Sequence, residues 1–160
     1  EKKKNEFKCF IANDNSNGQI VLSGTKNNIE KLSTYLNSIN IKNIKLSVSA
    51  PFHCELMKTA TELMRNELAK IFFKDFQTAL ISNVTAEEID DSSLISDLLV
   101  RQIESRVRWR ESINYMIKNG VNNFIEIGPG KILSGLVKRI DKKVKVGAIN
   151  NEEDINKIKI

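Results

Sequence analysis

The stretch that decides how this chain folds is Val48-Ser49-Ala50-Pro51-Phe52-His53-Cys54-Glu55-Leu56-Met57, where an extended run meets a long helical pattern. It contains the one histidine among 160 residues. The pattern predicts that His53 lies close to the N-terminus of a helix, where the positive end of the peptide dipoles favours the neutral, proton-accepting ring. Such a histidine suits a general base, and a partly buried structural histidine is the alternative.

On the C-terminal side of this stretch, apolar spacing predicts strands that alternate with helices. The expected helices cover residues 56–72, 94–102 (capped by Ser92 or Ser93), 109–119 and 132–140, with a short one from Asn151. The expected strands cover residues 79–83, 123–127 and 144–149. Gly120 is expected to end the third helix. This alternation predicts a mainly parallel α/β layer.

On the N-terminal side, the pattern predicts a small ββαβ unit. Two strands, residues 7–12 and 19–23, flank a cluster of turn-forming residues at 13–18. Thr25 is a suitable N-cap for a helix that runs to about Ile39, and a further strand is expected at 44–48. The turn Gly128-Pro129-Gly130-Lys131 is too short for a phosphate loop and predicts a tight strand-to-helix connection.

Composition limits the class of protein. With 41% hydrophobic residues the chain is expected to be globular. No segment approaches the roughly 20 apolar residues that cross a bilayer, so no membrane partner is expected. The N-terminus does not have the pattern of a secretory signal. Net charge +5 favours an acidic protein or an anionic ligand, because neither an aromatic-interleaved basic stripe nor zinc-finger spacing points to nucleic acid.

Cys9 and Cys54 are far apart in sequence and show no metal-type spacing. They are expected to be free thiols in a reducing compartment, although one disulfide is an alternative. The sequon Asn83-Val84-Thr85 is interpreted as structural, because such triplets are common by chance.

Five stretches in order resemble one enzyme family, the malonyl-CoA:acyl carrier protein transacylases of fatty-acid synthesis. They are residues 12–24 (ANDNSNGQIVLSG), 51–54 (PFHC), 81–86 (ISNVTA), 100–102 (VRQ) and 125–136 (IEIGPGKILSGL). The resemblance covers nearly the whole chain. It implies an α/β fold: part of an α/β-hydrolase-like large subdomain with a ferredoxin-like α+β small subdomain. Residues 1–48 would belong to the small subdomain and residues 49–160 to the C-terminal part of the large one.

The resemblance also implies a reaction, the transfer of malonyl from malonyl-CoA to the phosphopantetheine thiol of acyl carrier protein through an acyl-serine. His53 would be the base, and Gln102 would orient its ring through a backbone carbonyl. Asn15 and Gln19 would line the rim of the acyl-CoA cleft, with a purely turn-forming role as the alternative. Phe52 would favour malonyl over methylmalonyl by occupying the space of the methyl branch. Neither a bound cofactor nor a metal is implied.

The family's nucleophile elbow, Gly-His-Ser-Leu-Gly, would lie upstream, since the chain contains no Gly-x-Ser-x-Gly. The missing N-terminal half of the same protein is therefore an expected partner, beside acyl carrier protein and coenzyme A thioesters. A basic surface for the acidic carrier protein is expected from Arg106, Arg108, Arg110, Lys138 and Arg139. The implied compartment is a plastid or another organelle of fatty-acid synthesis, with the bacterial cytoplasm as the alternative. The alternatives for function are a polyketide synthase acyltransferase domain and a catalytically inactive module that docks acyl carrier protein.

Overall fold

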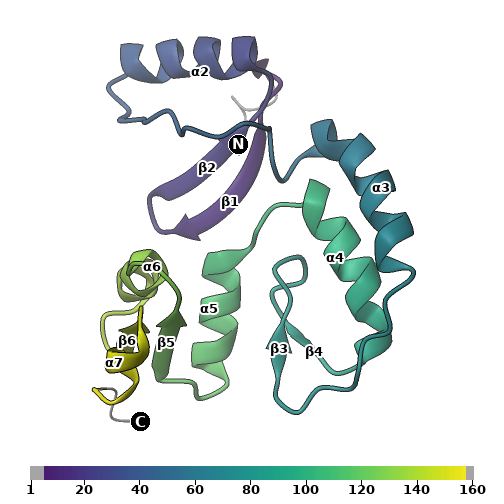
Figure 1. Ribbon diagram of the computed structural model, residues 1–160. Coiled ribbons are helices and arrows are strands. Elements are labelled where there is room, and N and C mark those ends of the chain that lie inside the picture. Colours follow the sequence, from purple (N-terminus) through teal and green to yellow (C-terminus); the bar gives the residue numbers. More distant parts are fainter. Residues whose placement is uncertain (1–5, 158–160) are drawn as a thin grey trace.

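The computed structural model describes residues 6–157. In this part of the chain the strands are arranged in pairs. Within it, β1 pairs with β2 and β3 with β4 in antiparallel fashion, whereas β5 and β6 are parallel. Figure 1 shows α5 in the middle, between the β1–β2 hairpin and the β5–β6 pair on one side and the β3–β4 loop and α4 on the other. The architecture is mixed α/β.

The N-terminal hairpin consists of β1 (Phe10–Ser16) and β2 (Gln19–Ser23). The predicted loop over residues 13–18 is wrong, because β1 continues to Ser16 and only Asn17 and Gly18 turn. Gly18 has a φ of 78°, which suits glycine in a two-residue hairpin. The turn-forming residues stay in the strand because alternate ones face the interior, where Asp14 and Ser16 are buried.

Helix α2 (Lys26–Ser38) follows the hairpin and confirms the predicted helix and its cap, since the Thr25 hydroxyl accepts a hydrogen bond from the Asn28 N–H at 3.3 Å. The strand predicted at 44–48 is wrong: these residues are irregular, and Ile44 is 74% exposed. No strand in residues 6–157 pairs with this segment, and a strand without a neighbour leaves its backbone groups unsatisfied. The unit is therefore ββα.

Two packed helices form the next part. A short 3-10 turn (Glu55–Met57) precedes α3 (Lys58–Leu68), which ends earlier than predicted and packs against α4 (Ile95–Glu104). A 3-10 turn, Ser92–Leu94, leads into α4. Its cap is the Asp91 carboxylate, which accepts a hydrogen bond from the Ser93 N–H at 2.8 Å, so the predicted cap at Ser92 or Ser93 is wrong by one or two residues.

Between α3 and α4 the chain forms a small hairpin. Its strands are β3 (Leu80–Ile81) and β4 (Glu88–Ile89). The strand predicted at 79–83 is therefore shorter than expected, and its partner is antiparallel.

The C-terminal part agrees with the sequence pattern. Its elements are α5 (Trp109–Lys118), β5 (Asn123–Ile127), α6 (Ile132–Ile140), β6 (Lys145–Ile149) and α7 (Glu152–Ile155). Ile113, Val137 and Val144 form the centre of its core. Beyond β5 and β6, parallel pairing among the described residues is limited to a bridge between Asn13 and Val107, so the predicted parallel layer is confirmed only in part.

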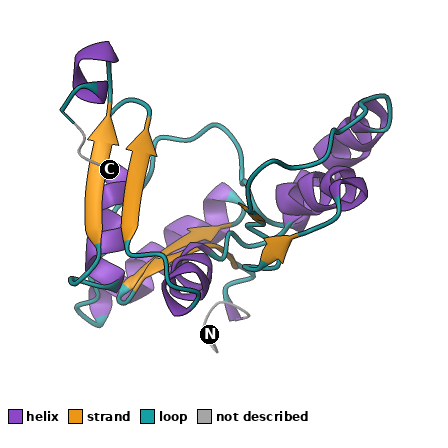
Figure 2. Ribbon diagram, turned by 90° about the horizontal axis from the view of Figure 1, so that it is seen from below, coloured by secondary structure: helices purple, strands orange, loops and turns teal. Residues whose placement is uncertain are grey.

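Figure 2 shows the β5–β6 pair at one end of the molecule, away from the helices at the other end. The last residue of β5, Ile127, is 81% exposed. Within residues 6–157, no helix combines the length and the apolar character needed to cross a membrane.

Candidate functional site

The backbone at His53 is held in an unusual conformation. His53 has a φ of 61°, in the left-handed region that is costly for residues other than glycine. Both polar groups of the preceding peptide are bonded: the Phe52 carbonyl accepts from the Ser23 hydroxyl at 2.6 Å, and the His53 N–H donates to the Ile103 carbonyl at 3.1 Å. The end of β2 and the end of α4 thus fix the direction of the histidine.

The imidazole itself meets the same end of α4. Its Nδ1 lies 2.9 Å from the backbone carbonyl oxygen of Gln102. Since a carbonyl only accepts, Nδ1 carries the proton, and in the neutral ring Nε2 is then the acceptor. The structure brings His53 and Gln102 together in the geometry that the resemblance implies.

A helical segment begins two residues after His53, as predicted: the 3-10 turn Glu55–Met57, with Cys54 as its N-cap, continues directly into α3 at Lys58. The ring also meets the last turn of another helix, since its Nδ1 faces the Gln102 carbonyl of α4. This carbonyl fixes which ring nitrogen carries the proton.

A hollow of about 380 Å³ adjoins the histidine. Its lining residues are Phe10, Ile11, His53, Cys54, Glu55, Glu104 and Arg106. Burial raises the pKa of the Cys54 thiol, and its Sγ lies 3.1 Å from the Pro51 carbonyl oxygen, to which it donates. Cys54 is thus held as a neutral thiol, which does not suit it as the nucleophile beside His53.

The other predicted site residues lie apart from the ring. Phe52 is 45% exposed and does not line the hollow. Asn15 is half-buried in β1, and Gln19 in β2 accepts a hydrogen bond from the Arg139 guanidinium. Phe10 and Ile11 of the same hairpin line the hollow beside His53, whereas Asn15 and Gln19 do not.

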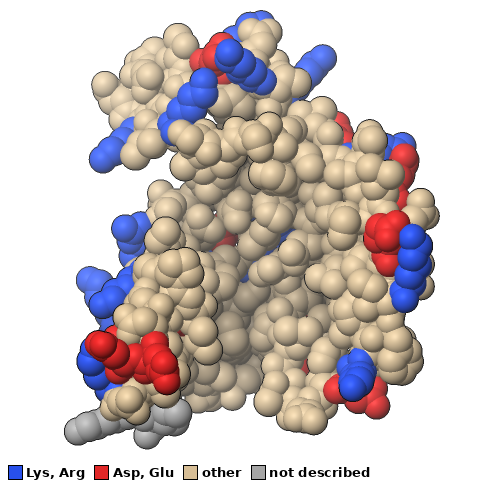
Figure 3. Space-filling model, in the orientation of Figure 1, with Lys and Arg blue, Asp and Glu red and all other residues tan. Residues whose placement is uncertain are grey.

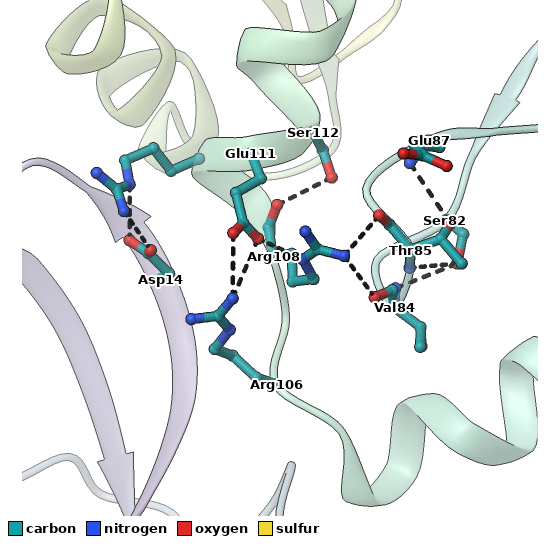
Figure 4. Close-up of polar contacts among 10 residues, drawn as sticks. Asp14, Ser82, Val84, Thr85, Glu87, Arg106, Arg108, Glu111 and Ser112 are labelled. Atoms are coloured by element: carbon teal, nitrogen blue, oxygen red, sulfur yellow. Dashed lines mark hydrogen bonds and ion pairs between the residues drawn. The ribbon is translucent and has the colours of Figure 1, made fainter. Parts of the chain in front are cut away.

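Three predicted carrier-binding arginines form internal ion pairs (Figure 4). Arg106 and Arg108 both donate to the Glu111 carboxylate, and Arg108 also donates to the Thr85 carbonyl at 2.7 Å. Arg110 binds both oxygens of Asp14, at 3.0 and 2.7 Å. Two carboxylates thus pair with three guanidinium groups, and the carrier-binding role of these arginines stays a prediction.

Sequence reasoning missed Asn83, whose side chain donates to the Gln102 Oε1 at 3.1 Å. Its sequence signal was the triplet Asn83-Val84-Thr85, which has an unrelated meaning in glycosylation. The half-buried position of Asn83 agrees with the structural interpretation of that triplet. Metal chemistry has no support in residues 6–157, where His, Cys, Asp and Glu side chains nowhere gather in a group of three or more that could hold an ion.

Comparison with known proteins places this geometry in a family. The acyl transferase domain matches residues 2–155. Malonyl CoA-acyl carrier protein transacylase from Bacillus subtilis is 44% identical over 146 residues, which are 91% of this chain but 46% of that protein. The chain therefore spans about half the length of the curated relatives it matches.

Solved structures agree. The acyl-carrier-protein-S-malonyltransferase of Bartonella henselae is 39% identical with a TM-score of 0.90, over 98% of this chain and 53% of that chain. A malonyl-transacylase in complex with the acyl carrier protein of a type II polyketide synthase is 34% identical with a TM-score of 0.87, over 92% of this chain and 48% of that chain. Since the domain match covers almost all of the sequence, this chain belongs to the acyl transferase domain family.

Proposed function

We propose that this chain is the histidine-bearing half of a malonyl-CoA:acyl carrier protein transacylase. The single observation that carries this proposal is the contact of His53 Nδ1 with the Gln102 carbonyl at 2.9 Å, which leaves Nε2 as a proton acceptor. Relatives named for this activity supply the substrate class. Malonyl-CoA and the phosphopantetheine thiol of acyl carrier protein are the proposed substrates, with no bound cofactor.

The proposed reaction exchanges a thioester through an ester. Nε2 of His53 takes the proton of a serine hydroxyl while the serine oxygen attacks the malonyl carbonyl. The carbon–sulfur bond breaks, and the coenzyme A thiolate leaves with the proton from the imidazolium. The carrier thiol then gives its proton to Nε2 and attacks the ester, and the serine oxygen recovers that proton as it leaves.

The serine is proposed to come from the half of the relatives' length that this chain does not match. The face shown in Figure 3 supports such a partner, because its centre is largely uncharged while lysines and arginines lie toward its edges. Several large apolar side chains are also exposed, among them Phe72 at 88%, Ile127 at 81% and Ile132 at 75%. Apolar exposure on this scale is typical of surfaces that another part of the protein covers.

The finer architecture is also a proposal. Residues 1–48 would be part of a ferredoxin-like small subdomain, supported by the ββα unit of β1, β2 and α2. Residues 49–160 would be the C-terminal part of an α/β-hydrolase-like large subdomain, supported by the parallel β5–α6–β6 unit. Asn15 and Gln19 on the hairpin would then line the rim of the cleft between the two subdomains.

For the compartment, we propose a plastid or another organelle of fatty-acid synthesis, with the bacterial cytoplasm as the alternative. The support comes from the thiols: Cys9 and Cys54 are both free and buried. Unpaired thiols persist in reducing compartments.

Complementation tests the proposed function. The chain produced together with an N-terminal half from the same protein should transfer malonyl from malonyl-CoA to acyl carrier protein. His53→Ala in that complex should lower the rate by several orders of magnitude, as expected when a nucleophile–base unit loses a member. Asn119→Ala, which alters a remote amide in the α5 cap, is the matched control. Transfer by the His53→Ala complex at the control's rate would disprove the proposal.

A second candidate, transfer to the carrier protein of a polyketide synthase, is favoured by the complex with such a carrier among the similar structures. Rates measured with a fatty-acid carrier and with a polyketide carrier would separate the two. A faster reaction with the polyketide carrier would support the second candidate.

A further inference from the structure

The last turn of α4 holds the histidine at two points. His53 N–H donates to the Ile103 carbonyl, and Nδ1 faces the Gln102 carbonyl. Both carbonyls belong to the end of the helix, where carbonyl groups have no partner within the helix. Any rotation of this turn would therefore move the ring and its backbone together.

Asn83 makes a further contact with this turn, through the side chain of Gln102. Its side-chain Nδ2 donates to Gln102 Oε1 at 3.1 Å, and its backbone carbonyl accepts from the Arg108 N–H at 3.0 Å. One residue thus binds the chain both before and after the connection between α4 and α5.

The loop that carries Asn83 is itself well fixed. The Ser82 N–H donates to the Glu87 carbonyl at 3.0 Å, and the Ala86 N–H donates to the Ser82 carbonyl at 2.9 Å. The Ser82 hydroxyl accepts from the Val84 N–H at 3.1 Å, and Arg108 reaches the Thr85 carbonyl, as Figure 4 shows. Asn83 is therefore presented to Gln102 by a loop with little freedom to shift.

We propose that Asn83 is a positioning residue for His53, acting through the side chain of Gln102. Any residue at position 102 supplies a backbone carbonyl, but an amide side chain gives the turn a second anchor. With this anchor the Gln102 carbonyl keeps its direction, and the ring keeps its proton on Nδ1. This inference rests on the proposed function only in assigning the oriented ring to proton transfer.

A double-mutant cycle in the complex of the two halves tests the inference. Asn83→Ala and Gln102→Ala should each lower kcat about tenfold. This is less than the roughly 100-fold loss of rate that a full 1 Å misplacement of a reacting group can cause, because the ring keeps its contact with the Gln102 carbonyl. The KM for malonyl-CoA should stay the same, because neither side chain is placed against substrate. The double variant should be no slower than either single variant, because both remove the same hydrogen bond.

A matched control separates this effect from the loss of any amide bond. Asn119→Ala removes a hydrogen bond from Nδ2 to the Tyr115 carbonyl, 2.9 Å long, in the last turn of α5, and should leave kcat unchanged. If Asn83→Ala does not fold, Gln102→Ala still decides the matter, since it keeps the backbone carbonyl and loses only the anchor.

Nitrogen NMR of the imidazole gives a readout that does not depend on activity. The wild-type ring should show one neutral tautomer with the proton on Nδ1, and each single variant should show a mixture of tautomers. Unchanged kcat with a single tautomer in both variants would overturn the inference, as would additive losses in the double variant. If His53→Ala retained transfer while the tautomers still mixed in Asn83→Ala, the proposed function would fail and the positioning role would stand.

Discussion

At the scale of single residues, one peptide plane and one ring nitrogen decide the chemistry. The Phe52–His53 peptide is bonded at both of its polar groups, and His53 adopts a φ of 61° as a consequence. A sequence cannot reveal such a conformation, because it results from contacts with Ser23 and Ile103, which are distant in the chain. The motif around His53 could still be recognised by resemblance, and with it the role of the Gln102 carbonyl.

Asn83 and Asp14 show what resemblance and spacing leave out. Asp14 falls in the predicted turn cluster and Asn83 at the end of a predicted strand, yet Asn83 binds Gln102 and Asp14 binds Arg110. Their partners are set by tertiary packing, so local pattern carries no signal for them. The ion pairs of Arg106, Arg108 and Arg110 with Glu111 and Asp14 were not predicted for the same reason, since a positive charge in the sequence does not show which carboxylate lies beside it.

The first prediction concerns Phe52 and the acyl group. Phe52→Ser in the complex of the two halves should weaken the preference for malonyl-CoA over methylmalonyl-CoA by about tenfold, because room for one methyl group is worth roughly 1–3 kcal/mol in a tight pocket. The ratio of kcat/KM for the two substrates measures this. Glu153→Ser, which alters an 86% exposed side chain on α7 outside the predicted site, is the control. Equal discrimination by the wild type and Phe52→Ser would show that another residue selects the acyl group.

At the scale of elements, the sequence predicted most closely those helices and strands whose stabilising contacts are local in the chain. The unit β5–α6–β6 was predicted closely because its strands and helix pack on one another within residues 123–149. The strand expected at 44–48 is absent because apolar spacing indicates only that a segment tends to be extended. It does not show whether another strand lies beside the segment to pair with it. Strand β1 was underestimated because the buried contacts of Asp14 and Ser16 outweigh the turn preference of their residue types.

The second prediction concerns the start of α6, which has no N-cap side chain of its own. Glu126 in β5 replaces it: its carboxylate accepts from the Ser134 N–H at 2.7 Å and the Leu133 N–H at 3.1 Å. The pKa of Glu126 lies below its ordinary value of 4.5, mainly because the Ser134 backbone N–H donates to its carboxylate. Glu126→Gln should therefore lower the free energy of unfolding at neutral pH.

The pH dependence of this effect has a definite sign. Because the pKa is lower in the folded than in the unfolded chain, the stabilisation is complete above the unfolded value and is lost as pH falls through the folded value. The difference in unfolding free energy between the wild type and Glu126→Gln should therefore shrink on acidification. Glu153→Gln, whose side chain is 86% exposed, is the control. A difference that stayed constant down to acid pH would contradict the capping role.

At the scale of the whole molecule, the third prediction concerns the joint between the hairpin and the C-terminal part. Arg110 binds both carboxylate oxygens of Asp14, whose side chain is only 9% exposed. Arg110→Ala should lower the unfolding free energy by about 1–3 kcal/mol, because it leaves a buried acceptor without its partner. Arg110→Lys should restore only part of this, since an ammonium group cannot bind both oxygens in the same way.

Denaturant unfolding of the complex measures this loss. Arg101→Ala is the control, because its pair with Asp97 is exposed on both sides, at 51% and 56%, and should contribute about 0–1 kcal/mol. Equal losses from Arg110→Ala and Arg101→Ala would mean that the joint does not depend on Arg110.

The fourth prediction concerns the acidic carrier protein. Beside the arginines, which form ion pairs within the chain, the turn between α6 and β6 provides the exposed Lys142 and Lys143, and the exposed Lys145 follows at the start of β6. Lys142→Glu combined with Lys143→Glu should raise the KM for acyl carrier protein several-fold at low salt and less at high salt, because exposed charges are screened. Lys58→Glu on α3 is the control. The same increase from Lys58→Glu would show that net charge, and not this turn, governs association.

The ion pair between Arg110 and Asp14 also bears on the order in which the molecule forms. The two residues are 96 apart in sequence, so their contact closes a long loop, whereas β5, α6 and β6 meet over short separations. Closing a long loop costs more entropy than closing a short one. We therefore expect the C-terminal unit to fold early and the N-terminal hairpin to join it late, although the hairpin is synthesised first. Ser23 reaches Phe52 only when that hairpin is in place, so His53 acquires its final direction among the last events of folding.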